Sequence, residues 1–164
     1  MNIVKPHKTP SLPVTDWRQI ASAAEELKGF IVTMPIVKYP ALALHHAQVS
    51  EHPYNFFVIH PEAIEKFKRY PHHGLVKDQV IVNPEIIDTG GSNDFVSEGC
   101  MSFQGRGLKK LRRWKAVEVR YQVPARGVFG VRLKQKQAAF TDVIAQVFQH
   151  ETEHGKGRNI YDGK

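Results

Sequence analysis

The stretch TDVIAQVFQHETEH, residues 141–154, is the part of the sequence that decides the fold. Its apolar residues recur every three or four positions, as in a helix with one buried face, and Thr141 is a suitable N-cap. His150 and His154 continue the apolar stripe, because residues i and i+4 lie on one face of a helix. The spacing therefore predicts a helix from which two imidazoles bind one metal ion, with Glu151 beside them to handle a proton.

Two histidines do not complete a hydrolytic metal site, which usually takes three protein ligands and leaves one position open. In the extended H-E-x-x-H-x-x-G-x-x-H motif the third ligand lies downstream, but Ile160 stands at that position. A metalloprotease of that type is therefore disfavoured, and the third ligand is expected upstream. The only cysteine, Cys100, offers a thiolate suited to Zn²⁺ or Fe²⁺. A lone cysteine is most often a small buried apolar residue, so the cysteine alone does not settle the site.

The composition indicates a soluble globular protein. The chain has 164 residues, of which 41% are hydrophobic and 24% charged, and these values favour one domain over residues 1–164. No apolar run approaches the length of about 20 residues that spans a bilayer, and residues 1–17 lack the apolar stretch of a secretory signal. We therefore expect a cytoplasmic protein with no membrane partner, and one cysteine suits a reducing compartment.

Basic residues outnumber acidic ones, giving a formal net charge of +7. They concentrate in RGLKKLRRWK (residues 106–115) and RLKQK (residues 132–136). A surface that binds nucleic acid or the ribosome is one interpretation. A solvated basic face is the simpler one, and no recognised nucleic-acid-binding motif accompanies the charge.

The remaining patterns predict a mixed α and β structure. Asp16 can cap a helix over residues 17–30, and a second short helix is expected over residues 41–48. The predicted strands are apolar or alternating runs over residues 56–60, 79–84, 116–123 and 128–134. The last two are separated by PARG, a turn signal, and should form an antiparallel hairpin.

Two motifs taken together resemble the signature of the peptide deformylase family. EGCMS (residues 98–102) matches its E-G-C-[L/M]-S, and QHETEH (residues 149–154) matches its Q-H-E-x-D-H. VIVNPEIIDTGG (residues 80–91) is similar to the strand and turn that precede the cysteine in that family, so the resemblance covers nearly the whole chain. It implies an α+β fold: one domain of mostly antiparallel β-sheets packed around a central C-terminal helix that carries H-E-x-x-H.

The resemblance also implies an activity, the removal of the formyl group from the N-formylmethionine of nascent polypeptides. Its implied metal ligands are Cys100, His150 and His154, which would hold one divalent ion, natively Fe²⁺ and in preparations Zn²⁺ or Ni²⁺. Glu151 would act as general base and then general acid. The side-chain amide of Gln48 and the backbone N–H of Met101 would stabilise the oxyanion.

The first motif of the family departs from its pattern in this chain. G-x-G-x-A-A-x-Q is expected, and residues 41–48 read ALALHHAQ, so that Gln48 alone is retained cleanly. Alanines replace glycines that would let a peptide backbone pass closely, and two histidines replace small alanines. Two alternatives therefore stay open: a homologue that acts on another N-formyl or N-acyl amine, and a catalytically weak protein that binds nascent chains or ribosomes.

Overall fold

The computed structural model describes residues 1–6, 8–36, 40–66, 75 and 79–162. Five strands form one sheet in the order β1-β2-β3-β4-β5, and all neighbours are antiparallel. The strands are β1 (Ala43–His45), β2 (Phe56–Ile59), β3 (Val80–Glu98), β4 (Lys109–Gly127) and β5 (Gly130–Thr141). The α-helices are α1 (Ala21–Ile31), α2 (Pro61–Glu65) and α4 (Asp142–Gly155), and the 3₁₀ turns are η1 (Trp17–Gln19), η2 (His46–Gln48) and η3 (Met101–Phe103).

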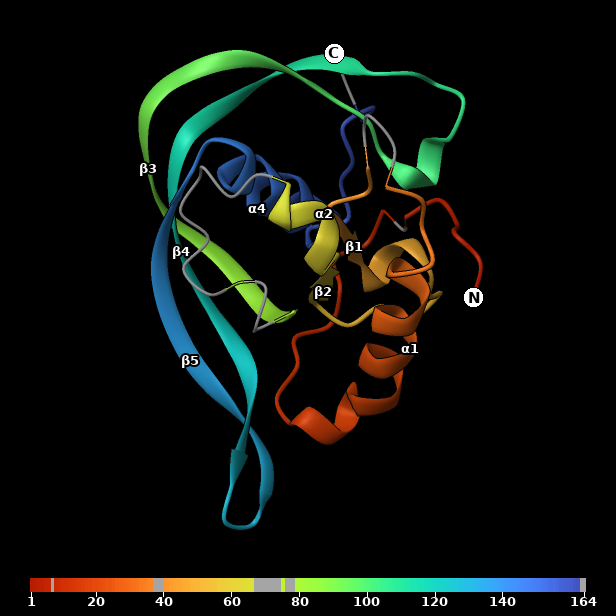
Figure 1. Ribbon diagram of the computed structural model, residues 1–164, viewed down its shortest axis with the longest axis vertical. Helices are drawn as coiled ribbons and strands as arrows, with labels where there is room; N and C mark the ends of the chain where they lie inside the picture. Colours follow the sequence, from red (N-terminus) through yellow and green to blue (C-terminus); the bar gives the residue numbers. More distant parts are fainter. Residues whose placement is uncertain (7, 37–39, 67–74, 76–78, 163–164) are drawn as a thin grey trace.

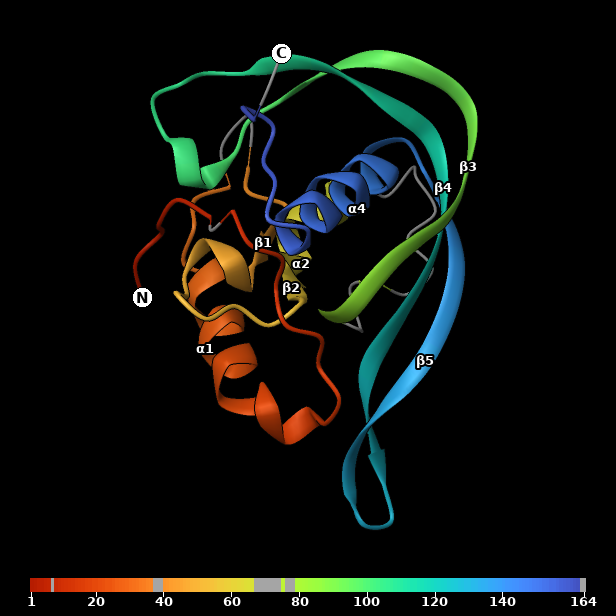
Figure 2. The ribbon, with the colours of Figure 1, turned by 180° about the vertical axis from the view of Figure 1, so that it is seen from behind.

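The long strands β3, β4 and β5 curve around α4 (Figures 1 and 2). Apolar residues of α4, among them Ile144 and Phe148, are fully buried in the core on the inner side of the curve. The ring of Phe148 stacks on that of Phe140 from β5 with 4.5 Å between their centroids. This packing fixes how α4 is rotated about its axis. The predicted α+β architecture around a C-terminal helix is confirmed.

The short strands β1 and β2 separate two parts of the core. Phe57 and Ile59 of β2 face the cluster that contains α4, whereas Phe56 and Val58 face the cluster that contains Leu27 of α1. The alternation follows from the two-residue period of a strand, and here both faces are buried. The part of the sheet formed by β1 and β2 is therefore packed on both of its faces.

In the N-terminal half the predicted helix of residues 17–30 and the strands of residues 56–60 and 79–84 are confirmed as α1 with η1, as β2 and as the start of β3. Asp16 caps η1, since its carboxylate accepts a hydrogen bond from the backbone of Arg18 at 2.8 Å. The prediction of a short helix over residues 41–48 is wrong. Residues 43–45 pair with β2 as a strand, and this pairing overrides the helical pattern.

The predicted hairpin is confirmed, but its turn is misplaced. PARG lies within β4, and the strands close at Gly127 and Gly130 around a two-residue turn. Gly130, which follows the two turn residues, has a positive φ of 109°, a conformation that glycine adopts readily. Pro124 is tolerated because β3 pairs with β4 only as far as Gln122, so that no third strand of the described residues pairs at the proline.

The start of α4 agrees with the prediction, because Thr141 occupies the N-cap position. Its hydroxyl makes no capping hydrogen bond, however.

Among the described residues there is no helix with the length and hydropathy needed to traverse a bilayer.

Candidate metal centre

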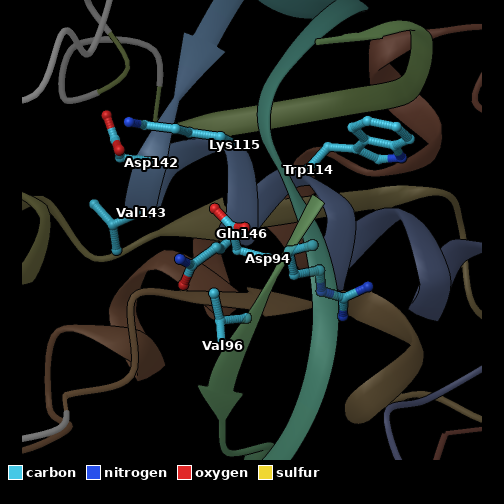
Figure 3. Close-up of a pocket in the computed structure, with 8 residues that line it drawn as sticks. Asp94, Val96, Trp114, Lys115, Asp142, Val143 and Gln146 are labelled. Carbon is cyan, nitrogen blue, oxygen red and sulfur yellow. The ribbon is translucent and has the colours of Figure 1, made fainter. Parts of the chain in front are cut away.

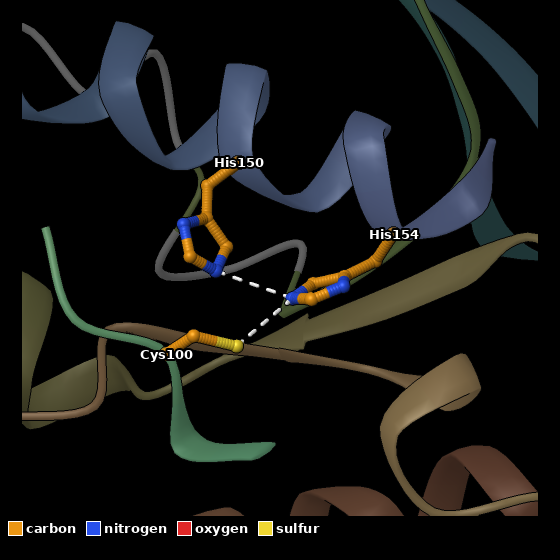
Figure 4. A group of neighbouring side chains, drawn as sticks. All are labelled: Cys100, His150 and His154. Atoms are coloured by element: carbon orange, nitrogen blue, oxygen red, sulfur yellow. Dashed lines mark hydrogen bonds between the residues drawn. The ribbon is translucent and has the colours of Figure 1, made fainter. Parts of the chain in front are cut away.

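The helix α4 carries both histidines on the side that faces the end of β3. His154 is buried and His150 half-buried. Cys100 follows the end of β3 by two residues and starts the turn η3, and its thiol is also buried. Figure 4 shows its sulfur below the two imidazoles, which extend toward it from adjacent turns of α4. Cys100 thus shares one small space with two histidines that follow it by 50 and 54 positions in the sequence.

The three potential ligand atoms have the spacing of a metal site. The Nε2 atoms of His150 and His154 are 3.2 Å apart, and His154 Nε2 lies 3.4 Å from Cys100 Sγ. All three atoms lie within 4.8 Å of one another. A tetrahedral ion with bonds of about 2.0–2.3 Å separates its ligand atoms by about 3.3–3.8 Å. One thiolate and two imidazoles therefore fit a single divalent ion.

A buried ionic network orients His150. Its Nδ1 lies 3.0 Å from a carboxylate oxygen of Glu98, which leaves Nε2 facing the site. The guanidinium of Arg113 donates two hydrogen bonds of 2.9 Å to Glu98 and two more of 2.9 Å to Glu153. Burial raises the pKa of Glu98, but the bonds from His150 and Arg113 outweigh it, so the pKa lies below its usual range. The carboxylate therefore stays charged and holds the imidazole.

The Glu151 side chain reaches the same space from α4. It is 4% exposed, and its Oε2 atom has no hydrogen-bond partner among the described residues. Burial raises its pKa to about 7, although the nearby His150 opposes this rise. A carboxyl group with such a pKa can both accept and release a proton near neutral pH.

Gln48 completes the arrangement from the opposite wall, and Met101 follows Cys100 directly in the turn η3. The Gln48 side chain is held by its own turn, because Oε1 accepts a hydrogen bond from the backbone of His45 at 2.9 Å. Its Nε2 atom lies 3.2 Å from Ser102 Oγ and 3.6 Å from Cys100 Sγ. One cavity of about 590 Å³ is lined by Gln48, Cys100, Met101, His150 and Glu151.

A family model described as polypeptide deformylase matches residues 6–163 of this chain. The chain belongs to this family. Peptide deformylase 2 of Nostoc is 33% identical over 125 residues, which cover 74% of this chain and 62% of that protein. Peptide deformylase 2 of Shewanella oneidensis is 30% identical over 144 residues, which cover 88% and 66%. The match thus spans less than two thirds of the length of either relative.

Solved deformylase structures share the fold. The crystal structure of peptide deformylase from Thermotoga maritima superposes with a TM-score of 0.69 and 22% identity, covering 99% of this chain and 97% of that one. A Plasmodium falciparum peptide deformylase gives a TM-score of 0.72 and 19% identity, covering 98% and 84%. At these identities the likeness establishes the architecture alone.

In the first-motif segment (residues 41–48), the two histidines lie where the sequence pattern did not indicate. His45 and His46 neither face solvent nor line the cavity, and they are 0% and 8% exposed. The Nδ1 atom of His45 accepts a hydrogen bond from the backbone of Ala47, and that of His46 accepts one from Tyr54, both at 3.0 Å. Burial lowers the pKa of His45 to about 3 and that of His46 to about 4. These histidines are structural.

Sequence reasoning missed Glu98, Arg113 and Gln149 as parts of the site. Gln149 is buried, and it exchanges hydrogen bonds with the backbone N–H and C=O of Trp114 on β4. Arg113 was assigned to a solvated basic face. It is instead buried, two and four residue pairs along β4 from the buried Val117 and Tyr121. The alternation of residues 116–123, continued toward the start of the strand, was the available signal, although the exposed Lys115 interrupts it.

Proposed function

We propose that this deformylase-family chain is a metal-dependent amide hydrolase that removes the formyl group from N-formylmethionine peptides or a related N-formyl substrate. The observation that carries the proposal is the convergence of Gln48, Cys100, Met101, His150 and Glu151 on one cavity. Three separate segments of the sequence supply them. An ordinary buried cysteine would not require two histidines and an unpartnered carboxyl oxygen beside it.

The proposed metal ligands are Cys100, His150 and His154, and the native ion is Fe²⁺, with Zn²⁺ or Ni²⁺ as substitutes. Thiolate and imidazole bind each of these ions, so the choice rests on the family resemblance. A divalent ion held there would supply Lewis acidity, which polarises a carbonyl and makes water more acidic. Glu98 would keep His150 oriented through its Nδ1 atom, a role that second-layer carboxylates often have.

The proposed proton carrier is Glu151. Its carboxylate takes a proton from the water that adds to the formyl carbon, and it then gives a proton to the amine nitrogen as the C–N bond breaks. Formate and a free N-terminal amine are the products. Burial favours the protonated form of the carboxyl, which delivers the second proton, and a divalent ion beside it would favour the ionised form, which accepts the first.

The proposed oxyanion donors are the Nε2 atom of Gln48 and the backbone N–H of Met101. Gln48 Nε2 carries two hydrogens, so it can donate to the substrate while it remains bonded to Ser102. Val147 and Val143 line the cavity one and two turns before His150 and would contact the first side chain of the substrate. Fixed donors of this kind stabilise negative charge that develops during the reaction.

The test is release of formate from formyl-Met-Ala-Ser by protein loaded anaerobically with Fe²⁺. We expect turnover that requires about one ion per chain. Absence of formate release from protein that holds one equivalent of Fe²⁺, Ni²⁺ or Zn²⁺ would reject the proposed activity.

Ribosome docking and a cytoplasmic location stay predictions. Part of the basic stretch of residues 106–115 is engaged within the chain. Arg112 and Lys110 lie over the ring of Phe95, with 4.6 and 5.4 Å to its centroid, and Arg113 is neutralised by two carboxylates. Salt-dependent co-sedimentation with ribosomes tests whether the remaining exposed basic residues bind them.

A further inference from the structure

The cavity beside Cys100 does not end at the apolar residues of α4. A second cavity of about 350 Å³ lies next to it, and the two share Val143 and Gln146 in their linings. Along β3, the second cavity is lined by Asp94 and Val96, whereas the first is lined by Ser97 and the residues that lead to Cys100. The two cavities therefore follow one another between α4 and β3.

Gln146 is a polar residue of α4 at the junction of the two cavities. Val143 and Val147 precede and follow it in the lining. Its side chain is half-buried and makes no hydrogen bond within the part of the chain that the structure describes. Gln149, one turn along, is bonded at both ends of its amide to Trp114. The amide of Gln146 is thus available to a ligand, and that of Gln149 is not.

The space beyond Gln146 is polar. Asp94, Lys115 and Asp142 line the second cavity, together with Val96. Figure 3 shows the Gln146 side chain between Val143 and Val96, with Lys115 and Asp142 further along the cavity. The first side chain of a substrate would enter from the metal side. Its methylene groups would lie against the valines, and its terminal group would reach Gln146.

We propose that Gln146 selects N-formyl substrates whose first side chain ends in an uncharged hydrogen-bonding group, such as the amide of glutamine. This inference rests on the proposed function and names its substrate class. A glutamine amide both donates and accepts hydrogen bonds, so it can pair with another amide in either orientation. A purely aliphatic side chain of the same length would cover the Gln146 amide without offering it a partner, which costs binding free energy.

The experiment compares two peptides of equal side-chain length, formyl-Gln-Ala-Ser and formyl-norleucine-Ala-Ser. Its readout is the ratio of their kcat/KM values, which cancels differences in metal loading. Gln146→Met keeps the side chain similar in size but removes the amide, and we expect the Gln/norleucine ratio to fall by about threefold to tenfold, as for one lost hydrogen bond. Gln135→Leu, an exposed change on β5 outside both linings, is the matched control and should leave the ratio unchanged.

A second measurement separates this inference from the proposed activity. The deformylated peptides Gln-Ala-Ser and norleucine-Ala-Ser are titrated into the wild type and Gln146→Met, and their Kd ratio is compared. If no formyl peptide is hydrolysed, the proposed activity fails, but a Kd ratio that depends on Gln146 still supports the polar subsite. If the Kd ratio and, where turnover occurs, the kcat/KM ratio are the same in both proteins, Gln146 does not select the substrate.

Discussion

The two walls of the cavity are built in different ways. On the metal side, α4 and the end of β3 hold Cys100 and the histidines with buried charges, because Arg113 joins Glu98 to Glu153. On the opposite wall, the first-motif segment (residues 41–48) contains no such ion pair. It is held by backbone pairing with β2 and by two buried neutral histidines.

The difference shows which residues can vary while the site is retained. Charged partners of the ligands are interdependent, because removal of one leaves another charge buried and unpaired. Gln48 needs only the right position of its backbone, and the turn η2 supplies it although histidines replace the family's alanines. Changes on the metal side should therefore have larger effects than changes in the first-motif segment.

The largest effect is expected from Cys100→Ala. It removes one of three proposed ligands, so the protein should lose bound metal together with all measurable turnover. Metal content per chain is measured by elemental analysis after dialysis. Full metal occupancy in this variant would show that the ligand assignment is wrong.

Glu151→Ala should lower turnover by about 10²–10⁴-fold, as expected for a positioned proton carrier. It should leave the metal content at that of the wild type, because the carboxylate is not a proposed ligand. The pair of measurements distinguishes it from Cys100→Ala. A variant with near-normal kcat would remove Glu151 from the mechanism.

The metal side was also the more predictable wall. The helical spacing of His150 and His154 requires one face of α4, and burial of Ile144 and Phe148 turns that face inward as the pattern indicates. The charged partners were not predictable, because Arg113 of β4 meets Glu98 of β3 and Glu153 of α4 only in the tertiary fold. Ion pairs between elements so far apart in the sequence cannot be inferred from a local pattern.

The first-motif segment was predicted poorly for a similar reason. Its local pattern favours a helix, but residues 43–45 complete the edge of the sheet. His45 and His46 replace small alanines of the family pattern, and the sequence alone does not show that their ring nitrogens accept backbone hydrogen bonds in the core. Whether a buried histidine is a ligand or a cap depends on which backbone groups approach it, and this follows from the tertiary fold.

Glu98→Gln tests how far the ionic network supports the metal. The amide keeps the shape but removes the charge beside His150, and loss of such a partner typically lowers metal affinity by about 10–100-fold. Competition with a chelator measures this affinity. Glu153→Gln is the matched control, since Glu153 shares Arg113 but, among the described residues, makes no hydrogen bond to His150, and its effect should be smaller. Equal effects of the two variants would show that the network acts as a whole and not through His150.

The buried histidines of the first-motif segment should make the fold sensitive to acid. Burial holds the pKa of His46 at about 4, below the value near 6.5 of an unfolded chain, so the unfolded state binds the proton more tightly. The stability contribution is complete above about pH 6.5 and is lost as the pH falls toward 4. His46→Asn should reduce the loss of unfolding free energy between pH 7 and pH 5 by about 1–2 kcal/mol. Urea denaturation of both proteins in the presence of a chelator measures it, and identical pH dependence would exclude His46 as the cause.

The smallest effect is expected where the first-motif segment lines the cavity. Ala41 and Ala43 are in the lining, so their methyl groups narrow the path of an extended peptide that glycines would admit. The double change Ala41→Gly and Ala43→Gly should lower KM for formyl-Met-Ala-Ser by about threefold, a modest relief of crowding, with kcat nearly unchanged.

Adding His45→Ala and His46→Ala, which would complete the family pattern, should bring no further gain and should destabilise the fold, because both imidazoles cap backbone groups in the core. Steady-state kinetics and thermal denaturation of the double and quadruple variants separate the two effects. A quadruple variant that is stable and more active than the double one would show that the histidines themselves restrict the substrate.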